Sequence, residues 1–288
     1  MYSILDFLLT SFFRGDSFHP PALPRIVRRS GPPLGGLDDL PHSIDLASSV
    51  AAWHDWGAQQ SQGRQGFDAE LCQLLRQITK KEVVENFKCD LGDVEGLSAS
   101  KSDLRRYATL RDFALAECHP WCNDHRPEVV RKNLLHHEVR ITKSPPFNSD
   151  YFVTHAWDGR LFLANAGGSH HFATAWHIAK EINLAVPLQG RLYRYSLRRD
   201  VVNDLLRSVR LLAAPAELTE NKLWRRALQK CDVLLAYILP PDPCRGSVIL
   251  AFAARNPRSS AVAETLAMNG AEDLGTRLQF IANSRARW

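Results

Sequence analysis

Apolar residues recur at helical spacing along much of the chain. Between residues 67 and 87, the side chains of Phe67, Leu71, Leu74, Ile78 and Val83 fall roughly one helical turn apart and predict a helix. The same periodicity predicts further helices over residues 103–117, 169–182, 201–212, 220–230, 260–268 and 273–282.

Shorter apolar runs have the length of β-strands. Residues 152–156 and 161–164 flank Asp158-Gly159, a turn dipeptide that predicts a β-hairpin. Similar runs at residues 233–239 and 247–253 predict an antiparallel strand pair. The segment 129–142 is expected to end as a strand. We therefore expect an α+β fold, in which a small mixed sheet is combined with a helical N-terminal region and a C-terminal strand pair plus helices.

Proline and glycine are concentrated between residues 18 and 41. This composition predicts an extended arm rather than a helix or a strand. We expect residues 1–130 to form a helical region that carries this arm (18–41), and residues 131–288 to form an α/β core with a C-terminal extension.

The step from the strand at 161–164 to the next helix is the feature that best predicts a ligand. Gly167 and Gly168 let the backbone approach a ligand closely, and Ser169 is a favourable N-cap for the helix. Free backbone N–H groups and the positive end of the helix dipole then meet at one point, an arrangement that binds phosphate groups. A tight strand–helix connection without a ligand has the same pattern.

The pentapeptide at residues 167–171, Gly-Gly-Ser-His-His, follows an Asp-Gly turn and a strand, and it resembles the phosphate-binding signature of the ParB/sulfiredoxin-like superfamily. The resemblance covers residues 134–212 and implies a ParB/sulfiredoxin-like core. Sulfiredoxins have Gly-Gly-Cys-His-Arg at this step, so Ser169 replaces the catalytic cysteine and His171 replaces the arginine. The first change argues against sulfinic-acid reduction through a thiol, and the second weakens a bidentate phosphate clamp.

The resemblance implies nucleotide or phosphate binding by the loop, through Gly167, Gly168, Ser169 and His170. It makes ATP or CTP, with Mg²⁺, the candidate cofactors. Arg191 and Arg194, on the next predicted strand, are expected to take the place of the missing arginine. Relatives of this fold include CTP-dependent DNA clamps, ATP-using kinases and reductases, and nucleases, so the fold alone does not choose a reaction.

Four side chains near the loop are candidates for catalysis. His170 and His171 lie at the helix start, where either ring reaches a phosphate, and Ser169 becomes a nucleophile if one of them acts as its base. Asp158 is a candidate base or metal ligand. Each also has a structural alternative: the serine as N-cap, the aspartate as a turn residue and the histidines as packing residues.

The six cysteines are scattered and do not form a disulfide framework, which fits a reducing, cytoplasmic setting. Cys118, Cys122 and His125 have a spacing that supplies three zinc ligands, but no second Cys or His pair completes the set, and buried thiols at a helix end are the competing interpretation. No apolar run reaches the ~18–20 residues that a membrane-spanning helix needs.

Basic residues are concentrated near the C-terminus. Residues 191–288 hold 16 Lys and Arg against 9 Asp and Glu, and most of the excess lies in 191–230. Such a surface suits a polyanion such as DNA, although a solvated helix face has the same composition. Two functions remain open: a nucleotide- or phosphate-binding protein with nucleotide hydrolysis or phosphotransfer, and a non-catalytic DNA- or protein-binding module on the same fold.

Overall fold

The computed structural model describes residues 69–143, 149–215, 247–268, 271–285 and 288. The predicted arm at 18–41, the helix at 220–230 and the strand at 233–239 lie outside these residues. The packing divides the chain into two compact units: one holds residues 69–79 and the described parts of 197–283, and the other holds the described parts of 80–196 and 284–288. Helices and strands occur in both units, which confirms the α+β fold.

The unit that contains residues 80–196 is built on a five-stranded mixed sheet with the order β1-β5-β3-β4-β2. Its strands are β1 (Thr79–Asp90), β2 (Val94–Leu97), β3 (Tyr151–His155), β4 (Leu161–Ala164) and β5 (Pro187–Leu197). β3 and β4 pair antiparallel and form the predicted hairpin, in which Gly159 has a φ of 75° that residues with a Cβ avoid. β2 is parallel to β4, and β5 is parallel to β3.

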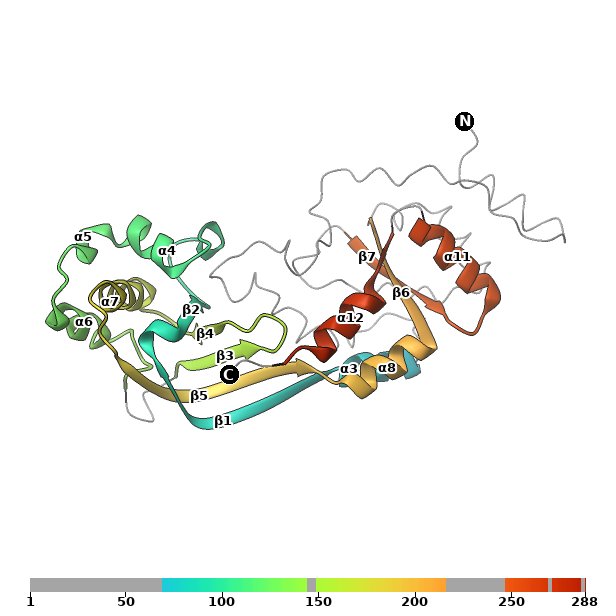
Figure 1. The fold of residues 1–288 in the computed structure, drawn as a ribbon, viewed down its shortest axis with the longest axis horizontal. Helices are drawn as coiled ribbons and strands as arrows, with labels where there is room; N and C mark the ends of the chain where they lie inside the picture. Colours follow the sequence, from blue (N-terminus) through green and yellow to red (C-terminus); the bar gives the residue numbers. More distant parts are fainter. Residues whose placement is uncertain (1–68, 144–148, 216–246, 269–270, 286–287) are drawn as a thin grey trace, which may run out of the picture. The chain divides into compact units, whose positions relative to one another are not determined.

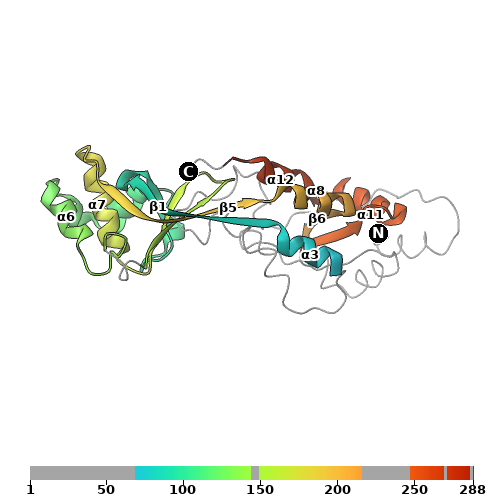
Figure 2. The same cartoon turned by 90° about the horizontal axis from the view of Figure 1, so that it is seen from below.

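β1 corrects the helix predicted over residues 67–87. Helix α3 (Ala69–Gln77) forms, but the helix prediction is wrong from Thr79 onward, where β1 begins. Asn86 has a φ of 55°, which interrupts the alternation of the strand. As a result Val84 and Phe87 both pack on the core, whereas Val83, which the helix prediction placed on the apolar face, is 48% exposed. β1 lies at the sheet edge beside β5 (Figure 2). Four of its charged side chains are exposed, namely Lys80, Lys81, Glu85 and Lys88.

Helices α4, α5 and α6 gather around α7 in this unit (Figure 1). The helical segments are η3 (Leu91–Asp93), η4 (Leu104–Arg106), α4 (Leu110–Glu117), α5 (His119–Cys122), α6 (Pro127–Leu134) and α7 (Ser169–Glu181). The helix predicted over 103–117 is divided into η4 and α4, because Thr109 and Asp112 form a capping box that starts α4. Phe113 of α4, Phe152 of β3 and Phe172 of α7 are fully buried in one apolar cluster, which fixes α7 in place.

The prediction of a strand at the end of residues 129–142 is wrong. α6 ends at Leu134, and residues 135–143 form turns and bends, apart from 139–140, which have no regular structure. The buried carboxylate of Asp150 holds these turns, because it accepts hydrogen bonds from the backbone N–H groups of Arg140 and Ile141 at 3.0 and 3.1 Å. The conformation of this segment therefore depends on Asp150, which follows it in sequence, so the apolar pattern of the segment alone does not predict it.

The other unit contains a three-stranded antiparallel sheet with the order β7-β6-β8. Its elements are β6 (Val209–Pro215), β7 (Ser247–Ala253), β8 (Glu272–Asp273), α8 (Arg199–Ser208), α11 (Pro257–Met268) and α12 (Leu274–Asn283), together with α3. α8 packs against α3 and α12, and α11 packs on β6 and β7 (Figure 1). The helices predicted at 260–268 and 273–282 are confirmed as α11 and α12.

β6 corrects the helix predicted over residues 201–212. α8 ends at Ser208, and the following residues pair with β7 from Val209 opposite Ala253 to Pro215 opposite Ser247. The apolar run is therefore shared between a helix and a strand, and the pairing with β7 decides where one ends. Among the described residues, no helix is both long enough and apolar enough to cross a membrane.

Candidate functional site

The loop between β4 and α7 brings a helix N-terminus to the surface of the five-stranded unit. Gly168, and not Ser169 as predicted, is the N-cap, with a φ of 70° and a ψ of 14°. Its carbonyl oxygen accepts the N–H of Phe172 at 2.9 Å. Ser169 is instead the first helical residue and is buried. A left-handed cap conformation favours glycine, which explains why the cap moves to residue 168.

The N-terminus of α7 has free donors. Among the described residues, the backbone N–H groups of Gly168, Ser169 and His170 have no hydrogen-bond partner. These groups, with the positive end of the helix dipole, are what an anion contacts at such a position. The prediction of free N–H groups at this loop is therefore confirmed.

The buried Asn165 side chain ties this loop to the segment after β2. Its Oδ1 accepts from the backbone N–H groups of Ser98 and Ala99 at 3.1 and 3.2 Å. Its Nδ2 donates to the carbonyl oxygens of Ala99 and Gly167, each at 2.9 Å. One amide thus holds two loops on either side of the helix N-terminus, which fixes residues 98–102 beside α7.

A cavity of about 540 Å³ lies where these loops meet the helix. It is lined by residues from four segments: Ala99, Ser100 and Lys101; Glu117 and Trp121; Glu138; and the run from Ala166 to His171. Lys101 is exposed and has no ion pair among the described residues. The cavity therefore combines a helix N-terminus, one lysine, hydroxyl and imidazole groups, and two carboxylates.

His170 belongs to a chain of hydrogen bonds along the cavity. Its Nε2 lies 3.2 Å from Oγ of Ser102, which donates to Glu117 at 2.7 Å. The Tyr107 hydroxyl also donates to Glu117. These two donors, Tyr107 first and Ser102 second, lower the pKa of Glu117 and keep it a carboxylate. Since Ser102 donates to Glu117, the Nε2 of His170 is the donor to Ser102.

Ser169 is less available than its position suggested. Its hydroxyl donates to Oγ of Ser100 at 2.9 Å, and the Nδ1 of His170 lies 3.4 Å away. The side chain is buried, although it belongs to the cavity wall. The serine and the histidine that were predicted as a catalytic pair are therefore adjacent, but the serine proton is already engaged.

His171 is held in a stack of rings. Its imidazole is nearly parallel to two other rings: Trp121, with centroids 6.0 Å apart and planes at 8°, and His136, with centroids 3.7 Å apart and planes at 19°. Its Nδ1 lies 2.8 Å from Oδ1 of Asn133. Burial is the main cause that lowers the pKa of His171, and His136 lowers it further. His171 therefore borders the cavity as a neutral, packed ring.

Asp158, Arg191 and Arg194 do not line the cavity. Asp158 is almost fully buried in the hairpin turn and pairs with Arg160 at 2.6 Å. Arg191 and Arg194 lie on β5 and pair with Glu85 and Glu82 of β1. The structure brings the loop residues and His170 together, but it does not bring these three predicted site residues to them. Lys101 is the cation that lies at the loop instead.

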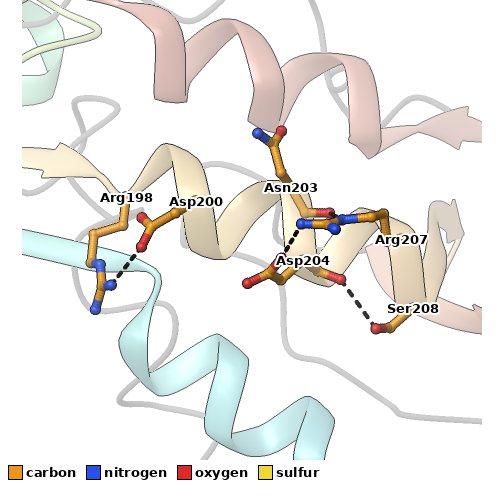
Figure 3. Close-up of polar contacts among 6 residues, drawn as sticks. All are labelled: Arg198, Asp200, Asn203, Asp204, Arg207 and Ser208. Carbon is orange, nitrogen blue, oxygen red and sulfur yellow. Dashed lines mark hydrogen bonds and ion pairs between the residues drawn. The ribbon is translucent and has the colours of Figure 1, made fainter.

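Most described arginines of the basic stretch at 191–230 pair with carboxylates, some of them from other parts of the chain. The ion pairs are Arg191–Glu85 at 3.0 Å, Arg194–Glu82 at 3.3 Å, Arg198–Asp200 at 2.6 Å, Arg207–Asp204, and Arg210–Asp273 at 3.0 Å. Figure 3 shows two of these pairs on and beside α8. Much of the positive charge is therefore balanced locally, which reduces the attraction of this stretch for a polyanion.

The predicted zinc ligands Cys118, Cys122 and His125 do not converge. Cys118 and Cys122 are buried, and their thiols donate to the carbonyl oxygens of His170 and Ala114 at 3.6 and 3.7 Å. Burial raises the pKa of Cys118 to about 12. The described residues contain no group of three or more His, Cys, Asp or Glu side chains that could hold a metal ion. The alternative interpretation, buried thiols at a helix end, fits these contacts.

The sequence patterns missed several cavity residues: Ser100, Lys101, Glu117, Trp121 and Glu138. All of them precede Ala166, the first cavity residue of the loop, by 28 residues or more. None belongs to a local motif, so no signal along the chain marks them. Only the excess of hydroxyl side chains at 98–102 distinguishes that segment.

A family model matches residues 84–287, well over half of the chain. Neither a curated protein nor a solved structure matches it. The matched range includes every segment that lines the cavity. The chain therefore belongs to DUF6685, a family of unknown function.

Proposed function

We propose that the cavity at the N-terminus of α7 binds the phosphate groups of a nucleotide or a related ligand. One observation carries the proposal: the N–H groups of Gly168, Ser169 and His170, unpaired among the described residues, lie at the positive end of a 13-residue helix that borders a cavity of about 540 Å³. The ParB/sulfiredoxin-like resemblance of residues 167–171 supports the same ligand class, with ATP or CTP as the first nucleotides to test.

The charges at the cavity favour a phosphate that arrives with a cation. Lys101 and the ring of His170 attract an anion, whereas Glu117 and Glu138 repel it. Mg²⁺ is commonly held by one or two carboxylates together with substrate phosphates, so it does not require a group of three protein ligands. We propose that a nucleoside triphosphate binds with Mg²⁺, and that Glu117 and Glu138 are the carboxylates available to it.

If the protein also hydrolyses or transfers a phosphate, His170 is the residue we expect to move the proton. Of the predicted catalytic side chains that line the cavity, it is the one that hydrogen bonds connect to a carboxylate, through Ser102 to Glu117. Ser169 donates to Ser100, His171 is packed against other rings, and Asp158 is paired in the hairpin turn.

Isothermal titration calorimetry of the full chain tests the proposal. The ligands are ATP and CTP, each with and without Mg²⁺, and the proteins are the wild type, His170→Ala and His119→Ala. His119 is an exposed histidine on α5 that does not line the cavity, so it is the matched control. We expect His170→Ala to lose one charge-assisted contact, about 1.5–3 kcal/mol or roughly tenfold to hundredfold in affinity.

The His119→Ala protein should bind as the wild type does, and Mg²⁺ should tighten the binding. If no triphosphate binds under either condition, the phosphate site is refuted. The non-catalytic binding module is then the hypothesis that remains.

A further inference from the structure

We infer that the ligand of this cavity carries a planar nucleobase and that the indole of Trp121 is the surface on which the base stacks. The inference rests on the proposed phosphate site and specifies what occupies the remainder of the same cavity. It makes the ligand a nucleotide and not inorganic phosphate, polyphosphate or a simple sugar phosphate.

The size of the cavity is the first observation. A volume of about 540 Å³ is much larger than a phosphate group needs and lies within the roughly 300–1,000 Å³ of small-molecule sites. Its wall also includes two kinds of surface. The phosphate-binding groups lie at the α7 N-terminus, whereas Trp121, Ala99 and Ala166 add apolar surface.

The placement of Trp121 is the second observation. Its side chain lines the cavity and yet is 50% exposed. A single exposed apolar residue on a protein surface is ordinary. Trp121, however, belongs to the same cavity as Lys101 and His170, so a ligand held by its phosphates would have an indole within the same enclosure. Stacking on an aromatic side chain suits any base, because every base has a π-face.

The contact of the indole with an ordered ring is the third observation. Trp121 lies parallel to His171, which in turn stacks on His136. Asn133 donates through Nδ2 to the carbonyl oxygen of Val129 at 2.9 Å, so its Oδ1 faces His171 and receives the proton on Nδ1. The ring behind the indole is therefore fixed in orientation. A platform that is already ordered before binding costs less conformational entropy when the ligand arrives.

The test separates the base from the phosphates. The full chain, as wild type, Trp121→Ala, Trp121→Phe and Leu135→Ala, is titrated with ATP, CTP, tripolyphosphate and adenosine in the presence of Mg²⁺. Leu135 is 78% exposed and does not line the cavity, so its truncation is the matched control for losing an exposed apolar side chain. Far-UV circular dichroism verifies that each variant is folded.

We expect Trp121→Ala to weaken nucleotide binding about fivefold to hundredfold, the value of one base–aromatic stack, and to leave tripolyphosphate unchanged. Trp121→Phe should recover most of the affinity, and Leu135→Ala should match the wild type. In addition, nucleotide should quench the intrinsic fluorescence of the wild type more than that of Trp121→Phe, because a stacked base quenches the indole that the variant lacks.

Two failures are distinguishable. If tripolyphosphate binds as tightly as ATP and CTP, or if Trp121→Ala binds nucleotide as the wild type does, the stacking inference is overturned and the phosphate site stands. If neither nucleotide nor tripolyphosphate binds the wild type, or if adenosine binds as tightly as ATP, the phosphate site itself is overturned.

Discussion

Gly168 lies against the backbone of Glu138 with no room for a side chain between them. A Cβ at residue 168 would stand 2.9 Å from the carbonyl carbon of Glu138, and the φ of 70° at this position is itself unfavourable for residues with a Cβ. We therefore expect Gly168→Ala to lower the free energy of unfolding by about 2–5 kcal/mol, from backbone strain and overpacking together. Urea unfolding of the purified protein measures the change.

Gly167→Ala is the matched control for this substitution. A Cβ at residue 167 would contact Cβ of Glu138 at 3.5 Å, which is an ordinary van der Waals distance. Gly167→Ala should therefore unfold close to the wild type. A Gly168→Ala protein as stable as Gly167→Ala would show that residues 138–139 do not press on the helix cap.

Asn165 should be as important for stability as a core residue. Asn165→Ala leaves the N–H group of Ala99 and the carbonyl oxygens of Ala99 and Gly167 without the Asn165 amide, whereas the N–H group of Ser98 keeps its bond to the carbonyl oxygen of Leu163. We expect a loss of about 2–4 kcal/mol in the free energy of unfolding, because unsatisfied buried groups cost more than the net value of a hydrogen bond. Thermal unfolding compares this variant with Asn123→Ala, an exposed asparagine that should tolerate truncation.

Asn165→Asp tests the role of the Asn165 Nδ2 group separately from that of its Oδ1. The aspartate keeps an acceptor for the N–H groups but turns a second oxygen toward the carbonyl oxygens of Ala99 and Gly167. It should destabilise the protein even though the side chain hardly changes in size. An aspartate variant as stable as the wild type would mean that these two loops are held by other contacts.

The parts of the fold that the sequence predicted well are those whose signals are local. The β3–β4 hairpin follows from Asp158-Gly159, and α7 follows from its apolar stripe after the glycines. β1 was missed because Asn86 shifts its alternation, and the end of α8 was missed because pairing between β6 and β7 decides it. In both cases a backbone conformation or a distant strand overrides the local pattern.

The candidate site, too, was predicted only in part. The loop at 167–170 was identified because the glycine pair and the helix are contiguous in sequence. The rest of the cavity lining was not predicted. Glu117 and Trp121 reach the cavity through the packing of α4 and α5 on α7, and Lys101 reaches it through the segment that Asn165 holds. Arg191 and Arg194 were assigned to the site from their position on the neighbouring strand, but Glu85 and Glu82 of β1 hold them instead. Sequence position on a strand does not specify the partner of a long charged side chain.

Cys89, Cys118 and Cys122 should be inert while the protein is folded. Burial raises the pKa of Cys118 and that of Cys89 to about 12, and burial also raises that of Cys122. Because the thiolate is the reactive form, we expect iodoacetamide at neutral pH to modify these thiols only after unfolding. Mass spectrometry of tryptic peptides, with and without urea, measures the modification of each residue. Rapid alkylation of Cys118 in the native protein, with no loss of structure, would contradict this expectation.

His171 and His177 should make the protein less stable in mild acid. Burial is the first cause that lowers the pKa of both, His136 lowers that of His171 further, and Glu138 and Glu181 oppose the shifts of His171 and His177. In the unfolded chain these histidines therefore take up protons near the ordinary histidine pKa of about 6.5, whereas in the folded chain they take up protons only at lower pH. The contribution of the two neutral histidines to the free energy of unfolding is complete above that pH. It is lost as the pH falls from about 6.5 toward their lowered pKa values in the folded state.

A substitution that keeps the ring but removes the titration isolates this effect. His171→Phe loses the contact with Asn133, which shifts the unfolding free energy at every pH, but it cannot bind a proton. Plotted between about pH 7.5 and 5.5, its unfolding free energy should therefore decline less steeply than that of the wild type. His177→Phe should remove a separate part of the slope, and the double variant should remove both. Parallel curves for the wild type and His171→Phe would show that the stacked imidazole is protonated as readily in the folded protein as in the unfolded chain.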